Sequence, residues 1–210
     1  LGLSFLLKED YPRLTDTERI NFAGEINQTS IKIFQMLENL LAWARTQTNQ
    51  IEYNPEYINL SEFAEELYEN TITQAHPKDI FLSFDVRRQH QVYADTLMLE
   101  TILKNLISNA IKFTPRGGAV RVKSELEPES HFVKISVFDT GIGLTQEEQG
   151  KLFHIDQHLR KTGTEGEEGS GLGLLVCQEF VRKHGGQIGV NSEPGEGSHF
   201  WVTLPTSDRT

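Results

Sequence analysis

The run from Asp95 to Thr114 has the most regular hydrophobic pattern in the chain and predicts a buried helix. Leucine, isoleucine, methionine and alanine fill most of its positions, and one polar stripe interrupts them, formed by Asn105, Asn109 and Lys112. Spacings of four and three residues place these side chains on one face of an α-helix. Asparagine costs about 0.6 kcal/mol relative to alanine inside a helix. Two of them in mid-helix therefore indicate a functional reason.

The chemistry of the stripe favours a magnesium nucleotide over a solvated helix face, which would usually be built from glutamate, lysine and arginine. A carboxamide offers a neutral oxygen that can bind a hard cation, and an N–H group that can donate to phosphate. Lysine adds a point charge for phosphate. The three side chains together predict a face that binds a phosphorylated ligand.

Upstream, the pattern predicts a helical hairpin. Residues 1–11 resemble the tail of a helix that ends at Pro12. Thr15 and Glu18 have the spacing of a capping box, which starts a second helix running to about residue 49. Its apolar positions alternate at four and three residues, as in a bundle, and include Ile26, Ile33, Leu37, Leu40 and Ala44. Two helices cannot bury so broad an apolar face alone, so we expect a four-helix homodimer in the intact protein.

A proline-containing connector at 50–60 is the predicted boundary, and a mixed domain follows it. Ser61 is expected to cap a helix that reaches residue 75. Further helices are expected at 146–153 and 171–184, and strands at 80–86, 91–94, 119–126, 131–139, 187–192 and 199–204. Strands grouped in hairpins with helices between them predict an α+β fold, a two-layer α/β sandwich with helices on one face of a mixed sheet. The polar segment 154–170 is long for a connection and typical of a lid.

Composition excludes several classes of protein. A net charge of −10 over 210 residues argues against a nucleic-acid binder, which needs a basic surface. No apolar run approaches the roughly 20 residues of a membrane span. The single cysteine, Cys177, lies in an apolar run, fits a reducing, cytoplasmic compartment and is expected to be a buried hydrophobe. The chain opens within a helical pattern, so we expect a fragment of a longer protein, and membrane anchoring of that protein stays open.

Two glycine motifs flank the predicted lid. Asp139-Thr-Gly141-Ile-Gly143-Leu144 follows a strand, and Gly169-Ser-Gly171-Leu172-Gly173-Leu174 opens a helix. Neither has the third glycine of a dinucleotide fold, and no P-loop occurs. Glycine permits close approach of a backbone to a ligand, and a helix start at Gly171 would offer free N–H groups to phosphate. Asp139 can accept a hydrogen bond from an exocyclic amine such as that of adenine, or serve in a plain Asx turn.

Four segments occur in a characteristic order: NLISNAIKFT, DTGIGL, KLF at 151–153, and GSGLGL. Together they closely resemble the ATP-binding domain of sensor histidine kinases, a Bergerat fold shared with Hsp90, gyrase and MutL. The resemblance covers about residues 58–206. The helix at 17–49 resembles the second helix of the kinases' dimerisation and phosphotransfer domain. The implied organisation is a partial helical hairpin at 1–52 and an ATP-binding catalytic domain at 58–206.

The resemblance implies ATP and Mg²⁺ as ligands and gives each site residue a role. Asn109 would bind magnesium, while Asn105 and Lys112 would contact phosphate oxygens. Asp139 would select adenine in a pocket shaped by Gly141 and Gly143. The remaining implied residues belong to the lid and the triphosphate path: Phe153 as lid anchor, Arg160 and Lys161 as γ-phosphate contacts, and Gly169, Gly171, Leu172 and Gly173 along the triphosphate.

Relatives that hydrolyse ATP carry a glutamate base at the position of Asn105, and a carboxamide cannot accept a proton near neutral pH. The resemblance therefore implies phosphoryl transfer to a histidine, for relay to an aspartate of a response regulator. None of the seven histidines has the context of the acceptor, so we expect the acceptor upstream of Leu1. His184 ends a predicted helix, where a positive charge would suit the helix dipole. The alternatives are an ATPase of the Hsp90 and MutL class, a serine kinase of the anti-sigma type, and a degenerate nucleotide-binding scaffold.

Overall fold

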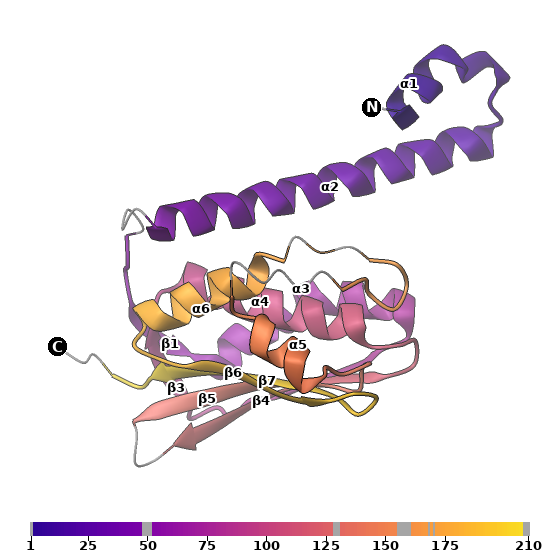
Figure 1. The fold of residues 1–210 in the computed structure, drawn as a ribbon. Coiled ribbons are helices and arrows are strands. Elements are labelled where there is room, and N and C mark those ends of the chain that lie inside the picture. Colours follow the sequence, from indigo (N-terminus) through magenta and orange to yellow (C-terminus); the bar gives the residue numbers. More distant parts are fainter. Residues whose placement is uncertain are drawn as a thin grey trace.

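A computed structural model describes residues 2–47, 52–127, 131–154, 161–167, 169 and 171–207. Two helices come first, and a domain of helices packed on one face of a sheet follows them (Figure 1). This is the α+β sandwich preceded by a helical hairpin that the sequence predicts. Within the described residues, no helix has the length and hydropathy needed to cross a membrane.

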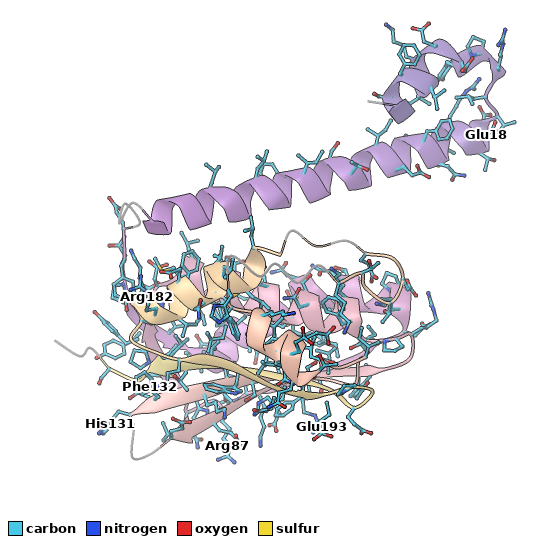
Figure 2. The ribbon with its side chains drawn as sticks, viewed as in Figure 1. Glu18, Arg87, His131, Phe132, Arg182 and Glu193 are labelled. Atoms are coloured by element: carbon cyan, nitrogen blue, oxygen red, sulfur yellow. The ribbon has the colours of Figure 1, made fainter. Side chains whose placement is uncertain are left out.

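The helical hairpin consists of α1 (Gly2–Glu9), the 3-10 turn η1 (Tyr11–Arg13) and the long α2 (Asp16–Gln47). The predicted capping box is present, because the Thr15 N–H donates to Glu18 Oε2 at 2.8 Å and the Glu18 N–H donates to Thr15 Oγ1 at 3.3 Å. Figure 2 shows Glu18 at the end of α2 that lies far from the sheet. Phe34, Leu37 and Leu41 are 62%, 51% and 55% exposed, so α2 carries an apolar face that this chain leaves uncovered.

The second half of the predicted connector at 50–60 forms a strand that the sequence analysis did not identify. Strand β1 (Glu56–Asn59) pairs antiparallel with β3 (Gln91–Ala94). The prediction that Ser61 caps α3 (Leu60–Ala75) was wrong. Asn59 is the cap, and its side chain accepts a hydrogen bond from the Ser61 N–H at 3.0 Å. A run of four residues is too short to show the alternation of apolar and polar side chains that is typical of a strand. Asn59 is both the last residue of β1 and the N-cap of α3.

The main sheet has five strands in the order β2-β4-β5-β7-β6. The strands β2 (Phe81–Asp85) and β4 (Ala119–Glu127) are parallel, and all other neighbours are antiparallel, so the sheet is mixed as predicted. The remaining strands are β5 (Phe132–Asp139), β6 (Ile188–Glu193) and β7 (Gly197–Pro205). Helices α3, α4 (Thr96–Phe113) and α6 (Gly173–Lys183) cover one face, and the short α5 (Gln146–Lys151) lies beside β6 (Figure 1).

Helix α4 is the centre of the core. Asp95 caps it, with Oδ1 accepting from the Met98 N–H at 3.0 Å. Its side chains Leu99, Ile102, Leu106 and Ile107 are fully buried, and each contributes roughly 1.5–3 kcal/mol by leaving water. Cys177, on α6, is buried as predicted, and burial raises the pKa of its thiol to about 12. The packing of α4 fixes the orientation of its polar stripe.

The expectation of a charged His184 was wrong. Its Nε2 accepts from the Asp95 N–H at 3.0 Å, and its Nδ1 lies 2.7 Å from the Phe180 carbonyl oxygen, to which it donates. Burial lowers the pKa of His184 below its usual value, so the neutral ring is the native form. The histidine joins the end of α6 to the start of α4.

Candidate functional site

The polar stripe of α4 lies where the glycine motif begins α6. Asn105 is half-buried, and its Nδ2 donates to the Thr101 carbonyl oxygen at 2.9 Å. A Cβ atom at Gly173 would stand only 2.4 Å from Asn105 Oδ1, so any larger residue there would displace the Asn105 side chain. The structure therefore brings together two predicted site residues that are 68 positions apart in the chain.

Lys112 meets the segment before the glycine motif. Its Nζ lies 3.4 Å from the Lys161 carbonyl oxygen and 4.7 Å from the centre of the Phe113 ring. A Cβ atom at Gly169 would lie 2.8 Å from the same nitrogen. Asn109 is half-buried on the same face of α4, between Asn105 and Lys112. The side chains of Asn105, Asn109 and Lys112 therefore lie in one polar cluster with the backbone of Lys161 and Gly169.

Asp139 ends β5 and is only 7% exposed. Its Oδ1 accepts hydrogen bonds from the Gly141 N–H at 2.9 Å and the Ser198 N–H at 3.1 Å. Burial raises the pKa of this carboxyl group to about 6, against the lowering effect of the two N–H groups. Near neutral pH the group is an anion, which also accepts a hydrogen bond from the Ser198 hydroxyl group. A carboxylate has about four acceptor sites, so it keeps capacity for a further hydrogen bond. It can accept one from a ligand.

The loop after Asp139 is held tightly at both of its predicted glycines. A Cβ atom at Gly141 would lie 2.5 Å from the Phe113 carbonyl oxygen, which ends α4. Gly143 has φ +65°, and a Cβ atom there would lie 1.9 Å from the carbonyl oxygen of Glu193, labelled in Figure 2. Sequence reasoning missed Gly197, with φ +91°, whose Cβ would lie 1.9 Å from the Asp139 carbonyl oxygen. The Pro-Gly-Glu-Gly turn at 194–197 carried that signal.

The structure places only part of the predicted lid. Phe153 is half-buried just after α5, which ends at Lys151 rather than at 153. Lys161 Nζ lies 2.9 Å from Glu148 Oε1 and 3.3 Å from the Gly143 carbonyl oxygen, so it joins α5 to the loop after Asp139. Arg160 lies outside the described residues.

Helix α6 was predicted to start at Gly171 and starts at Gly173 instead. Gly171 has φ +73° and precedes the helix, and Leu172 is the N-cap residue. Leucine has no side-chain acceptor, so the N–H groups of the first turn receive no side-chain cap from it. These groups point to the same end of α6 that approaches Asn105, where an anionic ligand would be stabilised.

The described residues contain no group of three or more histidine, cysteine, aspartate or glutamate side chains that could hold a metal ion. The donors near the stripe are carboxamide oxygens and a lysine. Such a set fits a magnesium ion that takes most of its ligands from phosphate and water, as Mg²⁺ in nucleotide sites usually does.

Comparisons with known proteins agree with this arrangement. Residues 94–208 match the family described as histidine kinase-, DNA gyrase B-, and HSP90-like ATPase. The adaptive-response sensory kinase SasA of Crocosphaera subtropica is 36% identical over 172 residues, which cover 81% of this chain and 44% of that protein. Across the curated relatives compared, the chain spans between 22% and 50% of their length.

Two solved structures extend the likeness to the whole chain. Full-length ShkA in complex with AMPPNP has a TM-score of 0.76 and 26% identity, covering 100% of this chain and 43% of that one. The histidine kinase ThkA in complex with the response regulator protein TrrA has a TM-score of 0.68 and 20% identity, covering 98% of this chain and 57% of that one. The second likeness shows the shared fold alone.

Proposed function

Because the chain belongs to the family of histidine kinase-, DNA gyrase B- and HSP90-like ATPases, we propose that it is the ATP-binding catalytic core of a two-component sensor histidine kinase. The core would pass the γ-phosphate of ATP to a histidine outside these residues, for relay to a response-regulator aspartate. The observation that carries this proposal is Asn105, which stands against the start of α6 where a hydrolytic relative has its glutamate base. The site binds phosphate without a group to activate water.

The roles of the chain's own residues follow from their positions. Asp139 accepts a hydrogen bond from the exocyclic amine of adenine with the acceptor capacity that Gly141 and Ser198 leave on its carboxylate. Lys112 and Asn105 contact phosphate oxygens, and the first turn of α6 adds N–H donors. Asn109 provides a carboxamide ligand for Mg²⁺, which supplies charge neutralisation on the phosphates when bound. Lys161 is the described lid cation nearest to this group, and it must leave Glu148 to reach a phosphate.

We also propose a homodimer formed through the apolar face of α2. Phe34, Leu37 and Leu41 stay exposed in a single chain, and a second copy would bury them in a four-helix bundle. A response-regulator receiver domain is the proposed second partner, and the cytoplasm, which holds ATP, is the proposed location.

Labelling with γ-labelled ATP tests the proposal directly. This chain should bind MgATP, release phosphate only at the background rate and incorporate no label, because the acceptor histidine lies outside it. A longer chain that carries the upstream segment should become labelled, and the label should be acid-labile and base-stable. Brisk phosphate release would favour the ATPase alternative, and label stable to acid would favour a serine kinase. Absence of MgATP binding would favour a degenerate scaffold.

A further inference from the structure

Lys78 is a buried lysine with no role in the site described above. It is 4% exposed and lies in the 3-10 turn η2 (His76–Lys78), which follows α3. Burial of an ammonium group is costly unless hydrogen bonds and a countercharge compensate. Its Nζ lies near four oxygens: Ile111 O at 3.0 Å, Lys112 O at 3.1 Å, Thr164 Oγ1 at 2.6 Å and Glu167 Oε1 at 3.0 Å. Two belong to the end of α4 and two to the segment before the glycine motif.

We name that segment, residues 161–167, the strap. Its own hydrogen bonds fold it into a tight loop, with the Gly163 N–H donating to the Glu167 carbonyl oxygen at 2.8 Å. The Glu165 N–H donates to Glu167 Oε2 at 2.8 Å, so both carboxylate oxygens of Glu167 are engaged. The Thr164 N–H donates to the Lys112 carbonyl oxygen at 3.1 Å. The strap therefore docks on the end of α4, and Lys78 lies beneath the docked loop.

The docked strap covers the side chain of Lys112. A Cβ atom at Gly163 would lie 2.7 Å from Lys112 Cγ, and the Lys161 carbonyl oxygen lies 3.4 Å from Lys112 Nζ. The glycine motif that leads to α6 begins two residues after the end of the strap. Any movement of the strap would shift both Lys112 and the approach of Gly169 to it.

We propose that Lys78 is a positioning residue for nucleotide binding, which acts by fixing the strap to the end of α4 through Glu167 and Thr164. The proposal rests on the proposed function. A lysine that only capped α4 would need the carbonyl groups of Ile111 and Lys112 and no partner in the strap. The ion pair with Glu167 ties the proposed ligand-binding side of the molecule to the turn after α3.

The sharpest variant is Glu167→Gln, because it weakens the attachment of the strap and keeps the bonds from Lys78 to α4. Glu165→Gln is the matched control, since it lies in the same strap and pairs with Arg116 at the surface. Amide hydrogen exchange without nucleotide measures docking at Thr164 and Glu165. Titration with MgATP and competition with adenosine measure binding. Thermal unfolding reports whether each variant is folded.

We expect Glu167→Gln to speed exchange at Thr164 and Glu165 about tenfold and to weaken MgATP binding about tenfold. Adenosine has no phosphate to meet Lys112, so its affinity should stay within about twofold of the wild type. Glu165→Gln should leave all three measurements near the wild type. Lys78→Met should weaken MgATP binding about as much as Glu167→Gln does. It should lose more thermal stability, because the C-terminal end of α4 and the strap both lose the ammonium group as a hydrogen-bond donor.

Unchanged exchange in Glu167→Gln would overturn the proposal, since the ion pair would then not hold the strap. Faster exchange with unchanged MgATP affinity would also overturn it, because docking would be structural only. If Glu167→Gln weakened the binding of MgATP and of adenosine by the same factor, the whole site would be damaged. That result would refute a specific role of Lys78 in positioning the residues that meet phosphate. A wild type that binds no MgATP at all would instead overturn the proposed function, and the positioning role with it.

Discussion

We expect the replacement Asp139→Asn to raise the stability of the ligand-free protein and to lower its affinity for nucleotide. Asp139 is buried, and burial raises the pKa of its carboxyl group from 3.8 to about 6. A shift of this size costs folding about 3 kcal/mol once the group is fully ionised. Asparagine carries no charge and keeps Oδ1 as the acceptor for the Gly141 and Ser198 N–H groups. Near neutral pH we therefore expect the variant to be more stable than the wild type, by up to about 3 kcal/mol.

The raised pKa of Asp139 also determines how the stability of the wild type changes with pH. Between about pH 4 and pH 6 the native carboxyl group of Asp139 holds its proton, while the unfolded chain has released it. The contribution of this group to the unfolding free energy therefore falls as the pH rises through that window, and it stays constant above it. Urea unfolding at several pH values measures the effect. The stability difference between Asp139→Asn and the wild type should be near zero at the acid end and reach its full size near neutral pH.

Two results would contradict this reasoning. A stability difference that is the same at pH 4 and pH 7 would mean that burial does not perturb Asp139. A variant less stable than the wild type near neutral pH would mean that both carboxylate oxygens serve the fold. Asp85→Asn is the control, because Asp85 is exposed on β2.

MgATP affinity should fall in Asp139→Asn even as stability rises, and inosine diphosphate should bind the wild type more weakly than ADP, since it lacks the amine.

Three further changes test other parts of the structure. Asn109→Ala should abolish the magnesium-dependent part of nucleotide affinity in calorimetric titration without unfolding the protein, while Asn70→Ala, an exposed control on α3, should not. Gly197→Ala should cost about 3 kcal/mol in urea unfolding, because its Cβ would strike the Asp139 carbonyl group, and Gly195→Ala, at φ +84° in open space, should cost about 1 kcal/mol. Leu37→Asp should reduce dimerisation in sedimentation experiments, whereas Leu97→Asp, 75% exposed on α4, should not.

Local patterns predicted most of the elements. The 20-residue run at 95–114 contains α4, and the capping box at Thr15 marks the start of α2. The two glycine motifs and the stripe were placed on the correct elements because strand ends, helix starts and helical faces have short-range signatures. The errors in these elements occur at their ends. Asn59 closes β1 and caps α3, and α6 starts two residues later than predicted because Gly171 has the non-helical φ of +73°.

The contacts that hold the site together have no such signature. Lys78 is 33 to 89 positions from its partners, and its His-Pro-Lys-Asp turn reads as a solvent-exposed corner. Asp139 owes part of its environment to Ser198, 59 residues away. His184 reads as a charged helix end until its burial against Asp95 is known. The environments of these three residues depend on which elements the topology places side by side. The periodicity of hydrophobic residues along the chain gives no information about that.

The end of α4 explains why these distant segments meet at the stripe. The last four carbonyl groups of a helix have no partner within it, and a buried helix end must find partners elsewhere. Here Ala110 accepts from Thr114, Ile111 from Lys78, Lys112 from Lys78 and Thr164, and Phe113 from the Ile142 N–H. The turn after α3, the strap and the loop after Asp139 are therefore all attached to one turn of helix. Because Asn105, Asn109 and Lys112 extend from that same helix, satisfaction of its carbonyl groups also holds the strap and the loop after Asp139 beside the proposed nucleotide site.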